Sequence, residues 1–192
     1  MVDAILFTHP HKDHVAGLDD VRGFNFFSSQ PMPVFANEMT QEVLIREFPY
    51  AFADMRYPGV PEIELNTIDL EPFAIGDIPV IPIQVWHLKM PVLAFRFGNF
   101  TYITDANKID SNEKVKARNS AVLVLNTLRK EKHISHFTLE EGMAIGNELQ
   151  AQQTYFTHLS HQMGKHEEVT QALPPGFSLA YDQLRITLPA IP

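Results

Sequence analysis

Apolar and polar residues alternate with two different periods along this chain of 192 residues, and each period predicts its own elements. The short apolar run Val2–Thr8 predicts a buried strand. Apolar positions three and four residues apart predict helices over Val15–Arg22 and Glu38–Phe48. Asp13 precedes the first of these helices, and we expect it to be the N-cap residue. Two further strands of this part are expected at Val34–Ala36 and Ile63–Ile68.

The middle of the chain has the pattern of an antiparallel meander. Strands are expected at Val80–Trp86, Val92–Phe97 and Phe100–Thr104, with the tight-turn pair Gly98-Asn99 between the last two. Helices and strands then alternate, in the order helix Ser111–Arg118, strand Ala121–Leu125, helix Leu139–Gln150, strand Thr154–Thr157, helix Lys165–Leu173 and strand Leu184–Leu188. This alternation predicts an α/β fold in one domain over residues 1–192, with helices packed outside a sheet.

Composition narrows the class of protein. Apolar residues make up 45% and charged residues 20% of the chain, as in ordinary globular domains. The apolar runs are far shorter than the ~20 residues that a membrane-spanning helix needs, and the first residues do not resemble a secretory signal. We therefore expect a cytoplasmic protein with no membrane partner. The net charge of −8 disfavours binding to long nucleic acids through their phosphates.

One stretch carries most of the candidate chemistry. Thr8-His9-Pro10-His11-Lys12-Asp13-His14 places three imidazoles and a carboxylate within six residues, directly after the first expected strand. Because the chain contains no cysteine, a metal site must use such ligands, which zinc, manganese and iron accept. His9 and His11 are two residues apart and point to the same side of an extended segment, whereas Asp13 and His14 enter the helix. The spacing indicates two metal ions rather than a histidine-rich surface turn.

The pattern H-x-H-x-D-H after an apolar strand resembles the signature of the metallo-β-lactamase superfamily, and later segments extend the resemblance over nearly the whole chain. Trp86-His87, Tyr102-Ile103-Thr104-Asp105 and Thr157-His158-Leu159-Ser160-His161 are similar to the strand ends that carry the family's other ligands. His136-Phe137-Thr138-Leu139-Glu140-Glu141 resembles the histidine-led helix start of the phosphodiesterase branch. Within that branch, the chain resembles the phosphoribosyl cyclic phosphodiesterases of phosphonate breakdown, which are relatives of the tRNA 3′-processing endonucleases.

The resemblance implies a role for each of these residues. The first ion would be held by His9, His11 and His87, the second by Asp13, His14 and His158, and Asp105 would bridge the two. The resemblance further implies that a hydroxide bound to both ions cleaves a small phosphodiester, such as a cyclic one. Asp13 would orient this nucleophile, and His136 would protonate the leaving alkoxide. The two divalent ions are expected to be zinc or manganese, with iron also compatible.

Several alternatives remain open. The same centre could hydrolyse an ester, a thioester or a lactam, for which His136 would not be needed as an acid. His87 could simply end a strand, and Asp105 could cap a loop. His161 competes with His158 for the last ligand position, although we expect His161 to be an outer residue or to face solvent. We expect His166 to lie on a solvated helix face, and His133 and His136 could belong to a polar loop and a helix start.

The family resemblance also implies an unusual beginning. Members of the family have several strands and a helix before the first motif, whereas eight residues precede His9 here. We therefore expect an αββα sandwich that lacks its N-terminal strands, with apolar side chains such as Ile5, Phe7 and Phe95 uncovered. Because an open sheet edge invites pairing with another chain, we expect a homo-oligomer. A truncated fold without catalysis is the alternative to an active phosphodiesterase.

Overall fold

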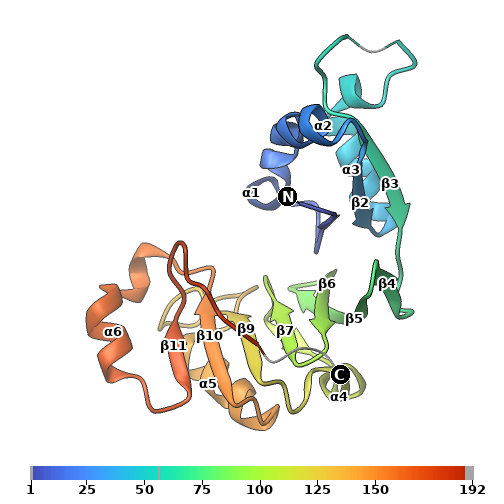
Figure 1. Cartoon of the computed structure of the whole chain (residues 1–192). Coiled ribbons are helices and arrows are strands. Elements are labelled where there is room, and N and C mark those ends of the chain that lie inside the picture. The colour runs from blue at the N-terminus through green and yellow to red at the C-terminus, as the bar shows by residue number, and fades with distance from the viewer. Residues whose placement is uncertain (1, 56, 189–192) are drawn as a thin grey trace. The chain divides into compact units, whose positions relative to one another are not determined.

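The computed structural model describes residues 2–55 and 57–188, and the chain divides into two compact units, Met1–Glu71 and Pro72–Pro192 (Figure 1). The first unit is built on a parallel sheet of three strands, in the order β1 (Ile5–Leu6), β2 (Met32–Ala36) and β3 (Ile63–Thr67). The connection from β1 to β2 contains α1 (Lys12–Val15), η1 (Ala16–Val21) and α2 (Arg22–Ser28). The connection from β2 to β3 contains α3 (Glu38–Glu47) and η2 (Pro49–Ala51). The helices and the sheet of this unit share a hydrophobic core that includes Val15, Leu18, Val34 and Leu44.

The first helical segment differs from the sequence prediction. The expected helix Val15–Arg22 is replaced by three short pieces that begin at Lys12, and Gly17 and Gly23 lower the helix propensity of this stretch. The N-cap residue is His11, whose backbone is still extended at φ −62° and ψ 146°. The prediction of Asp13 as the N-cap was therefore wrong, because Asp13 already lies in the first turn of α1. An acidic residue there still interacts favourably with the helix dipole.

The second unit is built on an eight-stranded mixed sheet. Its strands are β4 (Phe73–Ile75), β5 (Ile78–His87), β6 (Met90–Phe97), β7 (Phe100–Ile103), β8 (Lys108–Ile109), β9 (Val122–Asn126), β10 (Gln153–Thr157) and β11 (Phe177–Leu179). Their spatial order is β11-β10-β9-β7-β6-β5-β4, and β8 pairs with β5. The pairings make β5, β7, β9, β10 and β11 point in one direction, with β4 and β6 antiparallel to them.

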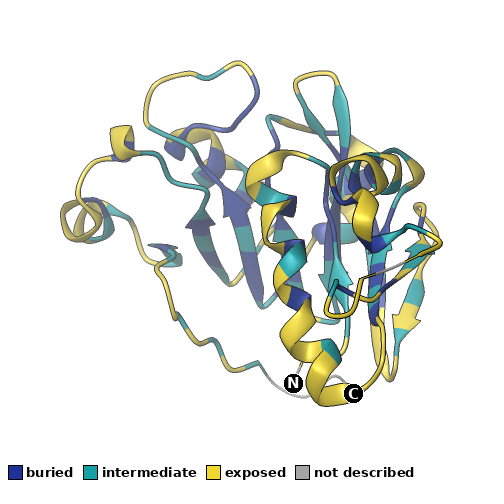
Figure 2. Cartoon of the chain, turned by 90° about the horizontal axis from the view of Figure 1, so that it is seen from above, coloured by how far each residue is buried: buried dark blue, intermediate teal, exposed yellow. Residues whose placement is uncertain are grey.

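Helices α4 (Ser111–Ala117), α5 (Leu139–Glu148) and α6 (His166–Ala172), together with η3 (His161–Met163), complete this unit. Figure 2 shows buried positions concentrated along the strands and exposed positions along the outer sides of the helices. Gly142 and Gly146 lie one turn apart on α5, and a Cβ on Gly142 would stand 2.3 Å from the Thr127 side chain. The two glycines therefore let α5 pack closely against the sheet. Every helix in the described part of the chain is too short or too polar to cross a bilayer.

The α/β fold and the antiparallel meander are confirmed, and one strand was predicted in the wrong place. Residues 184–188 form no strand, because β11 at Phe177–Leu179 already occupies the position beside β10. The turn before it, at Pro174-Pro175-Gly176, brings the chain back to the sheet sooner than expected. Phe7 and Phe95, which we expected to be uncovered, are buried, and Ile5 is half-buried.

Candidate metal centre

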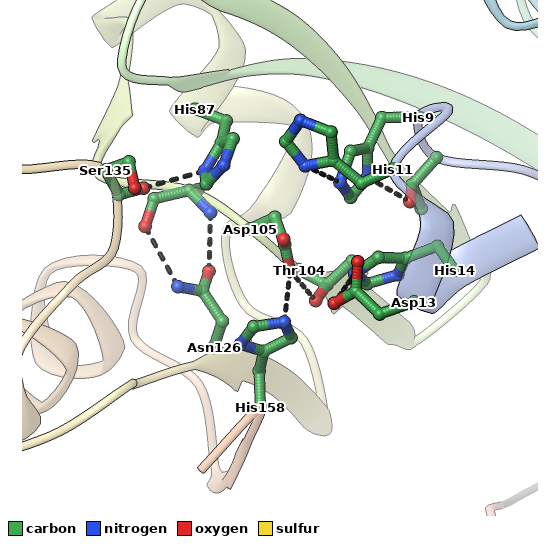
Figure 3. Close-up of polar contacts among 12 residues, drawn as sticks. His9, His11, Asp13, His14, His87, Thr104, Asp105, Asn126, Ser135 and His158 are labelled. Carbon is green, nitrogen blue, oxygen red and sulfur yellow. Dashed lines mark hydrogen bonds and ion pairs between the residues drawn. The ribbon is translucent and has the colours of Figure 1, made fainter. Parts of the chain in front are cut away.

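Three of the expected ligands come from strand ends of the second unit. His87 is the last residue of β5, His158 directly follows β10, and Asp105 is the second residue after β7. Because these strands point in the same direction, their carboxyl ends lie along one edge of the sheet. Figure 3 shows the side chains of His87, Asp105 and His158, with a dashed line between the last two. Ligands of α/β proteins bind at such edges.

Asp105 is almost completely buried and is held by its neighbours. Its Oδ1 accepts a hydrogen bond of 2.8 Å from the Thr104 hydroxyl and lies 3.2 Å from His158 Nε2. Asp105 and His158 both adopt left-handed backbone conformations, with φ of 53° and 57°. This conformation is costly for residues other than glycine, and such strain occurs preferentially at functional sites. The strain is compatible with a fixed position of the carboxylate.

His87 has a defined proton position. Its Nδ1 lies 2.9 Å from the backbone oxygen of Ser135, and since a carbonyl can only accept, Nδ1–H is the donor (Figure 3). The neutral ring then carries the lone pair on Nε2. Metal-binding histidines are commonly oriented in this way by a carbonyl or carboxylate behind the ring.

His136 lies beside these residues. His87, Asp105 and His136 each offer one ligand atom, and the three atoms lie within 4.8 Å of one another. The His136 side chain is buried, and among the described residues its Nδ1 has no hydrogen-bond partner. A buried polar atom in this state is unfavourable unless a bound group satisfies it. The ligand atoms of His87, Asp105 and His136 therefore suit a divalent ion, and the unsatisfied His136 nitrogen suits a divalent ion or an anionic substrate.

The surroundings of His136 keep its ring neutral. Burial lowers the pKa of His136 to about 4, and the Asp105 carboxylate acts in the opposite direction. The imidazoles of His158, His87 and His133 lower the pKa further. The rings of His136 and His158 are stacked, with their centroids 4.9 Å apart. At neutral pH His136 is therefore a neutral imidazole in the free protein.

The first unit carries the second set of expected ligands, on the segment after β1. His9 is fully buried, its Nδ1 lies 3.0 Å from the Thr8 hydroxyl, and its Nε2 lies 3.1 Å from His11 Nδ1. The ring of His14 is 4.3 Å from that of His9, centroid to centroid. Asp13 is more exposed, with an oxygen 3.4 Å from His14 Nε2. The structure therefore brings His9, His11, Asp13 and His14 together around the start of α1.

The remaining histidines lie where the sequence placed them. His161 is exposed at the start of η3, and His166 is exposed at the start of α6. His133 is half-buried, and its ring centroid is 5.1 Å from that of His136. His136 itself lies two residues before Thr138, which caps α5 in a capping box with Glu141. This cap fixes the chain directly after His136.

Sequence reasoning missed two features of the second unit. Asn126, at the end of β9, forms two hydrogen bonds with the backbone of Ala106, next to Asp105. A cavity of about 290 Å³ adjoins His158 and is lined by Thr157, His158, Leu159, Ala180, Tyr181 and Asp182. An asparagine ending an apolar strand was a usable signal for the first feature. The cavity could not be found from the sequence, because the last strand was expected at Leu184–Leu188 and lies at Phe177–Leu179.

Comparison with known proteins identifies the family. The profile of the β-lactamase superfamily domain matches residues 1–159. The chain belongs to the metallo-β-lactamase superfamily. A crystal structure of a diphosphatase from the PhnP family is 36% identical, with a TM-score of 0.87, and the match covers 95% of this chain and 69% of that one. This similarity agrees with the phosphodiesterase branch expected from the sequence.

Two further proteins match most of this chain. An octanoyltransferase of Porphyromonas gingivalis is 31% identical over 185 residues, which are 95% of this chain and 37% of that protein. This chain therefore spans little more than a third of the length of that relative. Human tRNase Z, short form, is 17% identical with a TM-score of 0.70, and the match covers 98% of this chain and 80% of that one. At this identity the similarity shows the fold alone.

Proposed function

We propose that this protein is a metal-dependent phosphodiesterase that acts on small phosphodiesters, cyclic ones included. The observation that carries the proposal is the convergence of His87, Asp105, His136 and His158 at one sheet edge, with a buried His136 nitrogen left for a bound group. The 36% identity with a PhnP-family diphosphatase supports chemistry at phosphorus. The family fold also supports a hydrolase more generally.

In this proposal the metal ligands are those that the family resemblance implies. One divalent ion would be held by His9, His11 and His87, the other by Asp13, His14 and His158, and Asp105 would be a ligand of both. Zinc and manganese suit this set of imidazoles and carboxylates, and iron is also compatible. Ions bound there would supply a nucleophile near neutral pH and neutralise negative charge on the phosphate.

The chain's own residues perform the remaining steps. Asp13 is the most exposed of the carboxylate ligands and orients the attacking water. The Thr104 hydroxyl and the strained backbone hold the Asp105 carboxylate in place. His136 gives a proton to the leaving oxygen. A phosphate anion beside its ring opposes the burial that lowers its pKa, so substrate binding itself favours the protonated form.

Two other substrates are favoured by specific observations. A diphosphate is suggested by the name of the 36% identical relative, and an acyl ester or thioester by the name of the P. gingivalis protein. Because this chain spans 37% of the latter, its named activity need not belong to the matched part. We therefore regard a diphosphate and an acyl ester or thioester as less favoured substrates than a phosphodiester.

The test compares three substrates with protein loaded with zinc or manganese. Bis(4-nitrophenyl) phosphate, inorganic diphosphate and 4-nitrophenyl octanoate report the three chemistries, and protein treated with a chelator is the control. We expect turnover of the phosphodiester, lost on chelation and restored by metal. Faster turnover of the diphosphate or the octanoate than of the phosphodiester would contradict the proposal.

Self-association belongs to the same proposal. Phe26 and Phe27 on α2 are 81% and 82% exposed, which is unusual for adjacent aromatic residues. We propose that this pair contributes to a homo-oligomer.

A further inference from the structure

The turn after His87 and the loop that carries His136 are joined by one side chain. It belongs to Asn107, which follows Asp105 by two residues and whose backbone N–H donates to the oxygen of Trp86 at 2.9 Å. This bond continues the pairing of β8 with β5 and fixes Asn107 beside the end of β5. Asn107 therefore stands at the edge of the sheet from which the candidate ligands come.

The oxygen of the Asn107 side chain stabilises the turn between β5 and β6. This Oδ1 accepts a hydrogen bond of 2.9 Å from the N–H of Leu88. Leu88 has a left-handed backbone, with φ of 58°, which is costly for a branched apolar residue. Because Leu88 directly follows His87, a bond that holds this strained turn also holds the backbone of His87.

The nitrogen of the same side chain holds the loop before α5. Asn107 Nδ2 donates to the oxygen of Ile134 at 3.0 Å, although Ile134 is itself 71% exposed. The next carbonyl of the loop, that of Ser135, accepts from His87 Nδ1 at 2.9 Å (Figure 3). Asn107, the His87 turn and two consecutive loop residues thus form a closed ring of hydrogen bonds. His136 directly follows this ring.

We infer that Asn107 is a positioning residue that orients His87 through its amide oxygen and His136 through its amide nitrogen. An amide can accept and donate at the same time, as this place between an N–H and a carbonyl requires. The inference rests on the proposed function and deepens it, because it assigns the placement of a proposed ligand and of the proposed acid to one side chain. Asn107 acts through these two histidines and is not itself a catalytic residue.

The two ends of the amide can be removed separately. Asn107→Asp keeps an oxygen for the N–H of Leu88 but places a second acceptor against the Ile134 carbonyl, whereas Asn107→Ala removes both bonds. Asn112→Ala, which changes an exposed asparagine on α4, is the matched control. The measurements are the metal affinity of the folded protein and kcat at a metal concentration that saturates each variant.

We expect the two variants to differ in metal affinity and to agree in kcat. Asn107→Ala should lower metal affinity about 10–100-fold, as for other residues that orient a ligand, and Asn107→Asp by less than about threefold. Both should lower kcat about tenfold or more on 2′,3′-cyclic adenosine monophosphate, whose leaving group is an alkoxide, and by less than about threefold on bis(4-nitrophenyl) phosphate. A residue that served stability alone would not separate the two substrates. Equal losses of kcat on both substrates in Asn107→Asp would overturn the inference, as would wild-type metal affinity in Asn107→Ala. Should Asn107→Ala not fold, the kcat ratio of Asn107→Asp decides alone.

A readout without turnover keeps the inference testable if the proposed function fails. If the metal-loaded wild type hydrolyses neither substrate, the phosphodiesterase proposal is wrong, and cleavage of the chelator-treated protein by trypsin decides for Asn107. Lys130 and Lys132 are exposed in the loop before Ile134. Both Asn107 variants should be cleaved there about fivefold faster than the wild type, because the loop opens more often once an ordinary hydrogen bond is lost. Cleavage at the wild-type rate in both variants, or equally fast cleavage of Asn112→Ala, would overturn the inference.

Discussion

The side chain of Asn126 is hydrogen-bonded to the backbone of Ala106 in both directions: it accepts from the N–H at 2.8 Å and donates to the oxygen at 3.0 Å (Figure 3). Both residues are completely buried. The same Ala106 oxygen accepts from Phe137 N–H at 2.9 Å. Asn126 therefore stabilises a backbone segment that lies between Asp105, in its strained conformation, and the residue after His136.

Asn126→Ala should weaken both the fold and the metal site. The buried N–H of Ala106 is left without its partner, which costs about 1–3 kcal/mol of stability, whereas the Ala106 oxygen keeps the hydrogen bond from Phe137 N–H. Metal affinity should fall about 10–100-fold, as for other residues that orient a ligand from behind. Asn126→Asp should be intermediate, because it still accepts from the N–H. Asn147→Ala, on the exposed side of α5, is the control. Metal titration of folded protein decides, and unchanged affinity in Asn126→Ala would contradict this positioning role.

Asp105→Ala should remove at least one of two bound ions. The carboxylate is the proposed ligand common to both ions. It is buried, and among the described candidate ligands of the second unit there is no other carboxylate that could take its place. Metal analysis after gel filtration gives the number of ions per chain. Glu140→Gln, an exposed acidic change on α5, should keep both. Two ions retained in Asp105→Ala would show that Asp105 is not the shared ligand.

Much of this arrangement could be predicted from the sequence, since the ligands follow short runs rich in β-branched and aromatic residues, which favour strands. Val80–Trp86 and Thr154–Thr157 are such runs, and His87 and His158 stand at their ends. The polar network could not be predicted, because Asn126 and Ala106 are twenty residues apart and meet only when β7 pairs with β9. The cavity lined by Tyr181 and Asp182 was missed for a similar reason. Leu184–Leu188 has the alternation of a strand, and only tertiary pairing shows that Phe177–Leu179 occupies that position.

His136→Ala should lower kcat without removing metal. A positioned acid contributes about 10²–10⁴-fold when the leaving group needs a proton. The loss should therefore be about 100-fold or more for an alkyl phosphodiester and less than about tenfold for a 4-nitrophenyl one. Gln171→Ala, exposed on α6, is the control. Equal losses on both substrates would contradict the acid role, and loss of metal would instead make His136 a ligand.

The stability of the metal-free protein should fall as the pH is lowered from 6.5 towards 4. Burial lowers the pKa of His136 to about 4 in the folded protein, so the unfolded chain takes up this proton first. The effect of this group on the free energy of unfolding is therefore absent above pH 6.5. On acidification below that pH the free energy of unfolding falls, by up to about 1.4 kcal/mol per pH unit. Urea unfolding at several pH values in the presence of a chelator measures this slope. His136→Gln should flatten it and His166→Gln should not. An identical slope in wild type and His136→Gln would refute the assignment.

The exposed pair Phe26 and Phe27 should mediate self-association. Their rings contact each other edge-on, with centroids 5.6 Å apart, and both are more than four-fifths exposed at the end of α2. Burying such rings against a second copy removes apolar surface from water, at about 25 cal/mol per Å². Replacing both by serine should therefore shift the protein towards monomer in light scattering, with a change in the unfolding free energy of the monomer of no more than about 0.5 kcal/mol. Val115→Ser changes a single exposed apolar residue on α4 and should leave the mass unchanged. A wild-type protein that is monomeric at every concentration tested would contradict the prediction, as would an oligomer that the double serine variant retains.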